Sequence, residues 1–339
     1  MRDALRLAEW EARLYAEHMA TGLAGQVLPA SQFGRDLSPE DVFIYHHSIH
    51  WEPGESLYAR ANCRRIIKYH NITPPEFFAG YSPVLEESCS LGRQQTTRLV
   101  AKGADLYLAD SAFNLQDLLQ AGADSARAHV LHPFHQTEML EKSQADLALL
   151  ARLLDGAVNI LFVGRFVPNK GHLHLLRTFA RFREQVNPHS RLILVGRPHP
   201  LLTGYSAAIE ATIKELRLER AVALIPGASP EELRAIYLSA HLFLCMSEHE
   251  GFCVPLVEAM RHKVPIVALA RTAVVETLGP GTLTSESPEP ALLADMMKQC
   301  LEHRTARQFT DHGYERYQSM FSPAVLSRQF LQLMGGVVG

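Results

Sequence analysis

The chain has 339 residues and a formal net charge of −3; 47% of its residues are hydrophobic and 20% are charged. This length suits two domains of ordinary size, and the composition is that of a globular protein with a substantial core. Because there is no basic excess, we expect no nucleic-acid partner. Five scattered cysteines without a C-x-x-C pair argue against a disulfide framework and a thiolate zinc site, and they fit a reducing compartment.

The N-terminal stretch mixes charges with Leu and Ala from Met1 on, so it lacks the apolar core of a signal peptide. We expect a helix here, followed by a short strand at residues 12–16. No apolar run reaches the roughly 18 residues that a spanning helix needs. The prediction is therefore a cytoplasmic protein, with the inner face of the membrane as the alternative location.

Short apolar runs alternate with longer helical patterns along the chain. In the first part the predicted strands are 42–47, 65–70, 105–110 and 128–133, and the clearest helix runs from about 85 to 102. After residue 157 the predicted strands are 159–164, 191–196, 221–226, 241–246 and 264–269, followed by helices near 171–186, 204–217, 230–240, 255–262 and 273–278. Continuous apolar strands with helices between them predict parallel sheets covered on both faces.

The polar segment from His135 to Gly156 interrupts this rhythm, and we interpret it as the hinge between two α/β domains. The predicted division is an N-terminal domain at residues 1–140, a linker at 141–157 and a C-terminal domain at 158–322. The last part of the chain is helical in pattern, and we expect a final helix at 323–339 that passes back to the N-terminal domain.

The stretch EHEGFCVPLVEAM, residues 248–260, places Glu250 and Glu258 on either side of a predicted helix start. Pro255 suits the start of that helix, which puts Glu258 in its first turn and Glu250 in the loop before it. Such a loop lies at the carboxyl edge of a parallel sheet, where open α/β sheets bind ligands. Amides at 251–254 would face an anion there, and carboxylates accept from hydroxyls. The pattern therefore predicts a sugar nucleotide, against the alternative of a solvated loop acid and a helix-start acid.

A second strand-to-helix junction, FVGRFVPNKGHLHLL at residues 162–176, carries the cations Arg165 and Lys170. Gly164 closes the strand, and Gly171 stands where the next helix begins. A guanidinium and an ammonium on one loop suit the charge of a diphosphate, although the P-loop pattern is absent. The alternative is two ordinary surface cations. If the strands are parallel, both junctions lie at the same sheet edge.

Together the two junctions resemble the C-terminal domain of glycosyltransferase family 4, the retaining enzymes of the GT-B fold. That family carries G-R-x-x-x-x-K-G and E-G-F-x-x-P-x-x-E-A. Here these read GRFVPNKG (164–171) and EGFCVPLVEA (250–259), about 80 residues apart. YHNITPPEFF (69–78) and LADSAFN (108–114) resemble a polysaccharide-biosynthesis branch of the family. The resemblance implies an α/β GT-B fold, with two Rossmann-like domains facing across a cleft.

The resemblance also implies a role for each motif residue. Arg165 and Lys170 would neutralise the donor diphosphate as the leaving group. Glu258 would hold the ribose diol, Glu250 would contact hydroxyls of the transferred sugar, and His70 would meet that sugar from the N-terminal domain. The amides that would add hydrogen bonds to the diphosphate belong to Gly251, Phe252, Cys253 and Val254. The positions near the base would be Gly196, Arg197 and Pro226, and those near the acceptor would be His46, His47 and His50.

The implied reaction is the transfer of a hexose, with retention, from a UDP- or GDP-sugar to a glycan or lipid-linked acceptor in polysaccharide or glycoconjugate biosynthesis. The departing phosphate would deprotonate the acceptor hydroxyl, so Glu250 is not expected to act as a nucleophile. Because no D-x-D occurs in the sequence, we expect a metal-independent enzyme whose only nucleotide ligand is the donor, without a cofactor. The sequence specifies neither the base, the sugar and the acceptor nor the oligomeric state.

One departure from the family leaves two alternatives open. The family normally begins with a strand and a Gly-rich loop, whereas Met1 opens inside what resembles the following helix. One strand, that loop and part of a helix are therefore expected to be absent, either because the start was trimmed or because the protein lacks them. The alternatives are a sugar-nucleotide binder that neither transfers nor hydrolyses its ligand, and a sugar-nucleotide epimerase.

Two further groups of residues are more ordinary in our interpretation. The pairs His132/His135 and His172/His174 lack a third ligand at metal spacing, so we interpret them as cleft and surface histidines. The basic cluster is interpreted as a solvated face, with contact to anionic lipid as the alternative; its members are Arg60, Arg64, Arg65 and Lys68.

Overall fold

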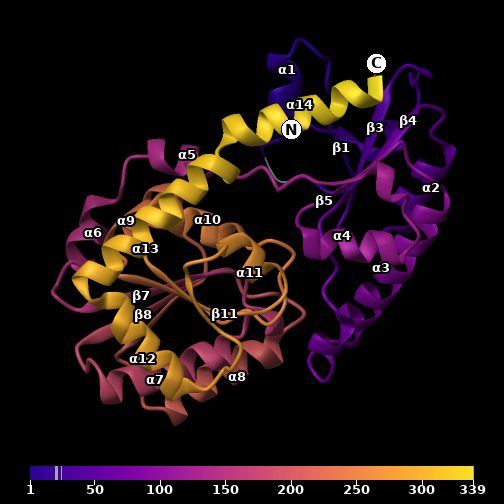
Figure 1. The fold of residues 1–339 in the computed structure, drawn as a ribbon. Coiled ribbons are helices and arrows are strands. Elements are labelled where there is room, and N and C mark those ends of the chain that lie inside the picture. Colours follow the sequence, from indigo (N-terminus) through magenta and orange to yellow (C-terminus); the bar gives the residue numbers. More distant parts are fainter. Residues whose placement is uncertain (20–21, 24, 339) are drawn as a thin grey trace. The chain divides into compact units, whose positions relative to one another are not determined.

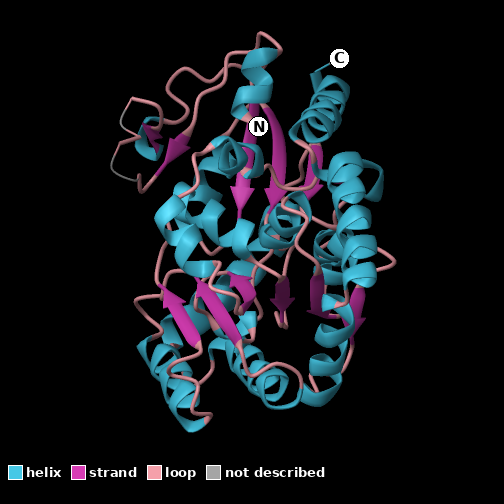
Figure 2. Ribbon diagram, turned by 90° about the vertical axis from the view of Figure 1, so that its left-hand side faces the viewer, coloured by secondary structure: helices cyan, strands magenta, loops and turns pink. Residues whose placement is uncertain are grey.

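The computed structural model describes residues 1–19, 22–23 and 25–338. The chain divides into two compact units. Unit 1 comprises Met1–Ile72, Ser88–Phe134 and Pro323–Gly339, and unit 2 comprises Thr73–Glu87 and His135–Ser322. In both units helices pack around parallel strands (Figure 1, Figure 2). The predicted α/β class with parallel sheets is confirmed.

Unit 1 is built on a four-stranded parallel sheet of order β3-β4-β5-β6. These strands are β3 (Val42–His47), β4 (Arg64–Tyr69), β5 (Leu106–Ala109) and β6 (Ala128–Val130). The helices are α1 (Arg2–Leu7), α2 (Glu52–Arg60), α3 (Pro83–Ala101, whose first turn is in unit 2), α4 (Ala112–Gln120) and α14 (Pro323–Val338). Two short strands, β1 (Tyr15–Ala16) and β2 (Leu28–Pro29), pair apart from this sheet, and 3-10 turns form at η1 (Ala30–Gln32) and η3 (Ser125–Arg127).

The core of unit 1 joins residues from both ends of the chain. Leu5 of α1 and Phe330 of α14 pack in one cluster with Ile66 and Leu108 of the sheet, and Phe330 is fully buried. The ring of Phe134 meets that of Phe330 edge-on, with centroids 5.9 Å apart. Figure 1 shows α14, in yellow, beside α1, in indigo. The C-terminal helix is therefore part of the core that the N-terminal helix enters.

Unit 2 has a six-stranded parallel sheet of order β12-β11-β10-β7-β8-β9. Its strands are β7 (Val158–Val163), β8 (Ser190–Val195), β9 (Val222–Ile225), β10 (Leu242–Cys245), β11 (Ile266–Leu269) and β12 (Leu283–Ser285). The first helices are α5 (Thr137–Lys142), α6 (Leu147–Leu153), α7 (His172–Gln185), α8 (Thr203–Glu215) and α9 (Pro230–Ser239). They are followed by α10 (Val254–Arg261), α11 (Ala273–Leu278), α12 (Pro290–Leu301) and α13 (His303–Arg316). Short turns are η2 (Pro75–Phe78), η4 (Pro168–Lys170) and the π-helical η5 (Tyr317–Phe321).

The predicted strands and helices lie close to the observed ones, because their apolar runs are buried on both faces. All four residues of β10 are buried, and so are all four of β11. Some helix starts carry side-chain caps: Ser229 and Glu232 form a capping box at α9. The prediction omitted β12, whose three residues are mostly polar and only partly buried. The segment 141–157, which we predicted as a linker, contains α6, capped by Asp146.

No helix in the described part of the chain is both long and apolar enough to cross a membrane.

Candidate functional site

In unit 2 the two sequence motifs follow neighbouring strands. β7 and β10 pair directly and in parallel, so the loops that leave their carboxyl ends meet at one edge of the sheet. The Asn169 side chain donates to the carbonyl of His249 at 2.9 Å. The backbone carbonyl of Asn169 accepts from the amide of Glu248 at 2.9 Å. These bonds tie the loop of Arg165–Lys170 to the loop of Glu250, so the structure brings the two motifs together.

Two glycines let neighbouring backbone segments approach each other closely at this edge of the sheet. Gly171 caps α7 in the left-handed conformation (φ 67°), and a Cβ there would lie 2.0 Å from the carbonyl oxygen of Met246. A Cβ at Gly196 would lie 1.8 Å from the carbonyl oxygen of Gly164. No other residue type fits either place without moving backbone. Gly196, predicted near the base, therefore has a packing role that the structure shows directly.

Lys170 and Glu250 form an ion pair, with Nζ and Oε1 2.5 Å apart. Glu250 is 7% exposed and the Lys170 side chain 15%. Burial opposes the charge on Lys170, but the Glu250 carboxylate outweighs it and raises the pKa of Lys170. The backbone amide of Glu250 donates to Thr272 Oγ1 at 2.9 Å, which holds the backbone that carries the carboxylate. Our prediction had Lys170 on the diphosphate and Glu250 on the sugar; without a ligand the two residues are partners.

The start of α10 presents amides at the same edge. Cys253 is its N-cap and adopts a left-handed conformation (φ 76°), with Pro255 in the first turn. Within the described residues, no acceptor is recorded for the backbone amides of Gly251, Cys253 and Val254. Phe252 is buried, and its ring packs edge-on against Phe321. Amides at a helix start attract an anion.

The prediction for Glu258 needs one correction. We expected Glu258 in the first turn of the helix, but α10 begins at Val254 and Glu258 is its fifth residue. The left-handed cap at Cys253 starts the helix earlier than the proline suggested. Glu258 Oε2 accepts from the hydroxyl of Tyr237 at 2.7 Å. Burial raises the pKa of Glu258, and this hydrogen bond offsets the effect only in part.

The remaining residues predicted to bind the donor lie at neighbouring strand ends. Arg165 is exposed after β7, Arg197 is exposed after β8 and Pro226 is exposed after β9. Within the described residues, no hydrogen bond or ion pair is recorded for the Arg165 guanidinium. Because the sheet order is β10-β7-β8-β9, the predicted positions run along its carboxyl edge in the order Glu250, Arg165, Arg197 and Pro226.

In unit 1, His70 stands at the carboxyl edge of the other sheet, just after β4. Its Nδ1 lies 3.0 Å from Asp110 Oδ2, and its Nε2 lies 2.8 Å from Nδ1 of His46. Asp110 is also ion-paired with Lys68, whose side chain is 1% exposed. Lys68 is therefore a core residue, and the predicted basic surface cluster of which it was a member is wrong in this respect.

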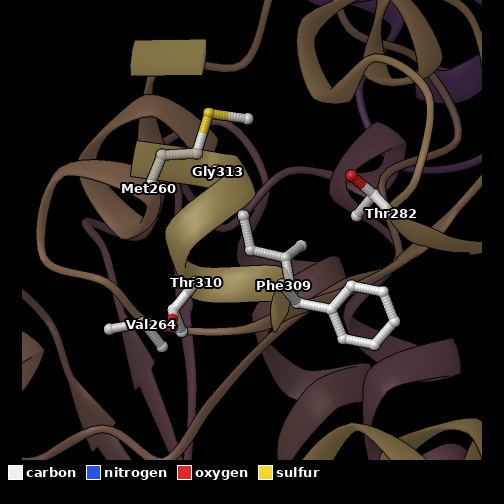
Figure 3. A pocket seen from close by; sticks show the side chains of 7 residues that line it. Met260, Val264, Thr282, Phe309, Thr310 and Gly313 are labelled. Carbon is white, nitrogen blue, oxygen red and sulfur yellow. The ribbon is translucent and has the colours of Figure 1, made fainter. Parts of the chain in front are cut away.

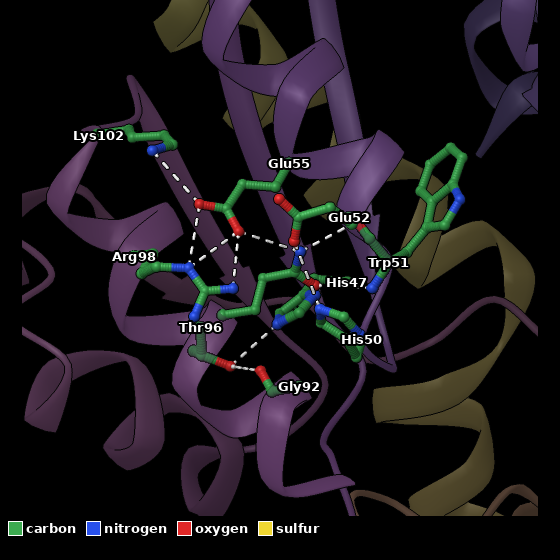
Figure 4. A network of polar contacts seen from close by, with 10 residues as sticks. His47, His50, Trp51, Glu52, Glu55, Gly92, Thr96, Arg98 and Lys102 are labelled. Carbon is green, nitrogen blue, oxygen red and sulfur yellow. Dashed lines mark hydrogen bonds and ion pairs between the residues drawn. The ribbon is translucent and has the colours of Figure 1, made fainter. Parts of the chain in front are cut away.

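His47 and His50, predicted near the acceptor, lie at and just after the end of β3. His47 is buried, and its Nε2 lies 2.9 Å from Thr96 Oγ1. The loop that carries His50 is fixed by Gln95, which donates to the carbonyl of Trp51 and accepts from its amide. Figure 4 shows the cluster around His47, His50 and Trp51 together with the Glu55 carboxylate, which is ion-paired with Arg98 and Lys102. The cluster satisfies buried polar groups and so has a structural explanation.

Two other features carry no chemistry. A small cavity of about 10 Å³ lies under α13 (Figure 3), lined by Met260, Val264, Ile266, Thr282, Phe309, Thr310 and Gly313. It has room for about one water molecule and its lining is mostly apolar. His132 and His135 bond to backbone carbonyls, and His172 packs on Tyr205. The described residues contain no group of three His, Cys, Asp or Glu side chains that would hold a metal ion.

Comparison with known families assigns the matched part of the chain. Residues 153–316, which lie inside unit 2, match the family model described as glycosyl transferases group 1. Residues 153–316 form a group 1 glycosyl transferase domain. Both motif loops, with Arg165, Lys170, Glu250 and Glu258, fall inside the matched range.

Curated relatives of the group 1 domain include two enzymes of mannose chemistry. An MMP alpha-(1->4)-mannosyltransferase of Mycolicibacterium hassiacum is 33% identical over 160 residues, 46% of this chain and 37% of that protein. Mannosylfructose-phosphate synthase of Agrobacterium fabrum is 25% identical over 261 residues, 72% of this chain and 56% of that protein. The chain thus spans less than two thirds of the length of these relatives.

Solved structures confirm the GT-B fold for the chain as a whole. Sucrose-phosphate synthase from Thermosynechococcus elongatus has a TM-score of 0.74 at 18% identity, covering 98% of this chain and 90% of its own. HepE of Anabaena, in complex with UDP and glucose, has a TM-score of 0.71 at 18% identity, covering 86% and 78%. The fold predicted from the two motifs is therefore correct.

Sequence reasoning missed several residues that build the group 1 domain's edge. Asn169, Thr272 and Tyr237 hold the loops or the Glu258 carboxylate, yet none stands out by residue type. Asn169 carried a signal, because a polar residue next to Lys170 in a tight turn often bonds to backbone. In unit 1, Asp110 also had a signal: it is a carboxylate directly after the apolar run of β5.

Proposed function

We propose that this protein is a retaining glycosyltransferase of family 4. It would transfer a hexose from a UDP- or GDP-linked sugar to a glycan or lipid-linked acceptor, without a metal ion. The observation that carries the proposal is the ion pair between Lys170 and Glu250 at the end of β7 and β10, beside the exposed guanidinium of Arg165. The relatives named for mannosyl transfer, and the HepE complex with UDP and glucose, support the donor class.

Cations and amides at this edge would stabilise the leaving diphosphate. Glu250 keeps Lys170 charged, and Arg165 is exposed on the same loop. The amides at the start of α10 follow the neighbouring strand and lie at the same edge of the sheet. Electrostatic stabilisation of developing charge, preorganised in this way, is usually the largest part of catalysis. With two cations and a helix start on the diphosphate, the reaction would need no metal ion.

Glu250 would bind hydroxyls of the transferred sugar rather than attack it. One of its oxygens is engaged by Lys170, which lowers its nucleophilicity and leaves the other oxygen to accept from hydroxyls. This supports a front-face reaction in which the departing phosphate takes the acceptor proton. Glu258 would accept from the ribose diol with the oxygen that Tyr237 does not use. The contact of His70 with the sugar stays a prediction.

A donor panel tests the proposal. The full chain is incubated with UDP-, GDP- and ADP-sugars in the presence of a chelator, and thermal shift and release of nucleoside diphosphate are measured. We expect one donor class to stabilise the protein and to be turned over. Lys170→Ala should lower the turnover about 10²–10³-fold, the effect of losing one preorganised charge-stabilising group.

Lys214→Ala is the matched control, since Lys214 is exposed on α8, and it should change nothing. A thermal shift without release, with acceptor sugars present, would favour the non-catalytic binder. Conversion of one UDP-sugar into its epimer would favour the epimerase. Turnover that needs an added divalent metal would contradict the metal-independent mechanism.

A further inference from the structure

The carboxyl edge of the unit 1 sheet holds a chain of four polar side chains. Lys68, on β4, is ion-paired with Asp110, and its Nζ also donates to the carbonyl of Leu131 at 2.5 Å. Asp110 Oδ2 lies 3.0 Å from His70 Nδ1. His70 Nε2 lies 2.8 Å from His46 Nδ1, and the two imidazole planes are 11° apart with centroids 5.1 Å apart, so the rings lie edge to edge along this hydrogen bond. This chain of hydrogen bonds thus runs from the buried ammonium of Lys68 to His46, which is exposed.

The charges at the buried end determine where the protons lie. Burial alone would raise the pKa of Asp110, but the hydrogen bond from His70 and the charge of Lys68 outweigh it, and the pKa is lowered. Asp110 is therefore an acceptor, and His70 Nδ1 must donate to it. Since Lys68 already balances the carboxylate, a neutral His70 leaves the cluster balanced in charge. Its Nε2 then accepts, so His46 Nδ1 must be the donor in the outer bond.

This order leaves one nitrogen unused. In a neutral His46 whose Nδ1 carries the proton, Nε2 holds a lone pair. The part of the His46 ring that packs against the protein is desolvated, and this, with smaller contributions from His70 and Lys68, lowers the pKa of His46, while the side chain keeps exposed surface. Asp110 acts in the opposite direction, and the Met1 ammonium adds slightly to the lowering. His46 therefore stays neutral, and its Nε2 stays an acceptor, over the physiological pH range.

We propose that Asp110, His70 and His46 form a polarised hydrogen-bond chain that presents Nε2 of His46 as a binding point for a sugar hydroxyl. A hydroxyl is a donor and fits this nitrogen, whereas a phosphate or carboxylate oxygen, which lacks a proton, does not. Lys68 is the positioning residue that keeps Asp110 ionised. The assignment of the hydroxyl to a sugar acceptor rests on the proposed function, and the chain of hydrogen bonds does not.

Nitrogen NMR of the nucleotide-free protein, labelled at histidine, tests this chain of hydrogen bonds. At pH 8 we expect both His46 and His70 to be protonated at Nδ1 and unprotonated at Nε2, and we expect His46 to take up no further proton when the pH is lowered to 5. Free imidazole prefers the other tautomer and titrates near ~6.5. A proton on Nε2 of His46, or an ordinary titration of His46 in this range, would overturn the proposal.

Methyl glycosides of glucose and mannose are then added to the same sample. The His46 Nε2 resonance should move, the resonances of exposed His129 should not, and the fully O-methylated glycosides, which have no hydroxyl, should have no effect. An equal response to the O-methylated compounds, or none to either glycoside up to its solubility, contradicts a hydroxyl site. Because no donor is present, this result is independent of the donor panel.

His46→Asn separates the binding point from the fold. The Asn amide nitrogen can still donate to His70 Nε2 from the position of Nδ1, but nothing takes the place of the outer acceptor. We expect the His70 tautomer and the melting temperature to be kept. In the unchanged protein the His70 resonances should move with His46 when glycoside is added, because the two rings share a hydrogen bond, and this movement should be lost in the variant. His129→Asn is the matched control and should respond like the unchanged protein. A glycoside response that survives in His46→Asn would assign the binding to another group.

Discussion

Units 1 and 2 each place a lysine and a carboxylate together at the carboxyl edge of a parallel sheet, but the two pairs differ in setting. Lys68 and Asp110 have side chains 1% and 7% exposed, and a backbone carbonyl takes a further proton of the ammonium. Lys170 and Glu250 are 15% and 7% exposed, and Lys170 lies on a loop with no other partner recorded among the described residues.

The difference indicates what each pair is for. A pair whose two side chains are shut off from solvent has little to offer a ligand, and removing one member leaves an uncompensated charge in the core. A pair with an accessible cation can exchange part of its contact for a phosphate. The same two residue types therefore stabilise one unit and, in our proposal, bind the donor in the other. Residue type and a position near the carboxyl edge of a sheet do not distinguish these roles; the exposure of the lysine side chain does.

The largest expected effect is on the Lys68 pair. Lys68→Met should lower the free energy of unfolding of unit 1 by about 3–5 kcal/mol, the cost of breaking a buried pair. Lys170→Met should destabilise unit 2 less and lower donor turnover about 10²–10³-fold. Native-state hydrogen exchange of amides in β4 and in β7 measures each unit separately. Equal losses in the two variants would show that the comparison drawn from exposure is wrong.

A second test compares two glycines with similar backbone angles. A Cβ added at Gly171 (φ 67°) would lie 2.0 Å from the carbonyl oxygen of Met246, whereas a Cβ added at Gly103 (φ 76°) would meet open space. Gly103→Ala should cost about 1–2 kcal/mol, the left-handed penalty alone. Gly171→Ala adds a backbone clash worth roughly 1–3 kcal/mol more and should also weaken donor binding. Hydrogen exchange and the donor thermal shift measure these effects; an equal cost at both positions would mean that the edge of unit 2 can relax.

The smallest expected effect is a pH dependence in unit 1. Burial lowers the pKa of His47 to about 4, so the unfolded chain binds the proton more readily than the folded one. The stability that neutral His47 contributes is present above the unfolded pKa of ~6.5 and is lost as the pH falls toward about 4. Between pH 7 and pH 5 this amounts to about 2 kcal/mol.

His47→Gln keeps a polar atom near Thr96 and removes the titration. The pH dependence of exchange in β4 should therefore be about 2 kcal/mol shallower in this variant than in the unchanged protein. His129→Gln, at an exposed position, is the control and should leave the slope as it is. Identical slopes in His47→Gln and the unchanged protein would show that His47 does not carry the acid sensitivity.

Much of the fold follows from the sequence because most of its strands are short apolar runs whose side chains are buried on both faces of the sheet. β3 is predicted at its observed bounds, and the loops of Arg165 and Glu250 are predicted at one sheet edge, which the pairing of β7 with β10 confirms. The partnerships within the sites do not follow. Whether Lys170 faces solvent or pairs with Glu250 depends on a contact 80 residues away in the sequence. Whether Lys68 lies on the surface or in the core depends on Asp110, 42 residues away. Local patterns do not encode contacts of that kind.

Helix boundaries show a similar limit. Pro255 correctly indicated a helix start, but the left-handed Cys253 moved that start to Val254 and took Glu258 out of the first turn. A non-glycine residue in that conformation is uncommon, and the sequence offers no sign of it. The segment Thr73–Glu87 is a second example: its contacts assign it to unit 2 although its chain neighbours belong to unit 1.

The packing of α14 against α1 has a consequence for biosynthesis. Phe330 and Met334 fill the same core as Leu5 and Ile66, so the first unit to begin leaving the ribosome is also the last to obtain all of its apolar partners. Unit 2 can form its sheet while unit 1 still waits with part of its core uncovered. Chain order and folding order are therefore expected to run in opposite directions here, and a ribosome that stalls before α14 is made would hold an N-terminal unit that is exposed to chaperones and proteases.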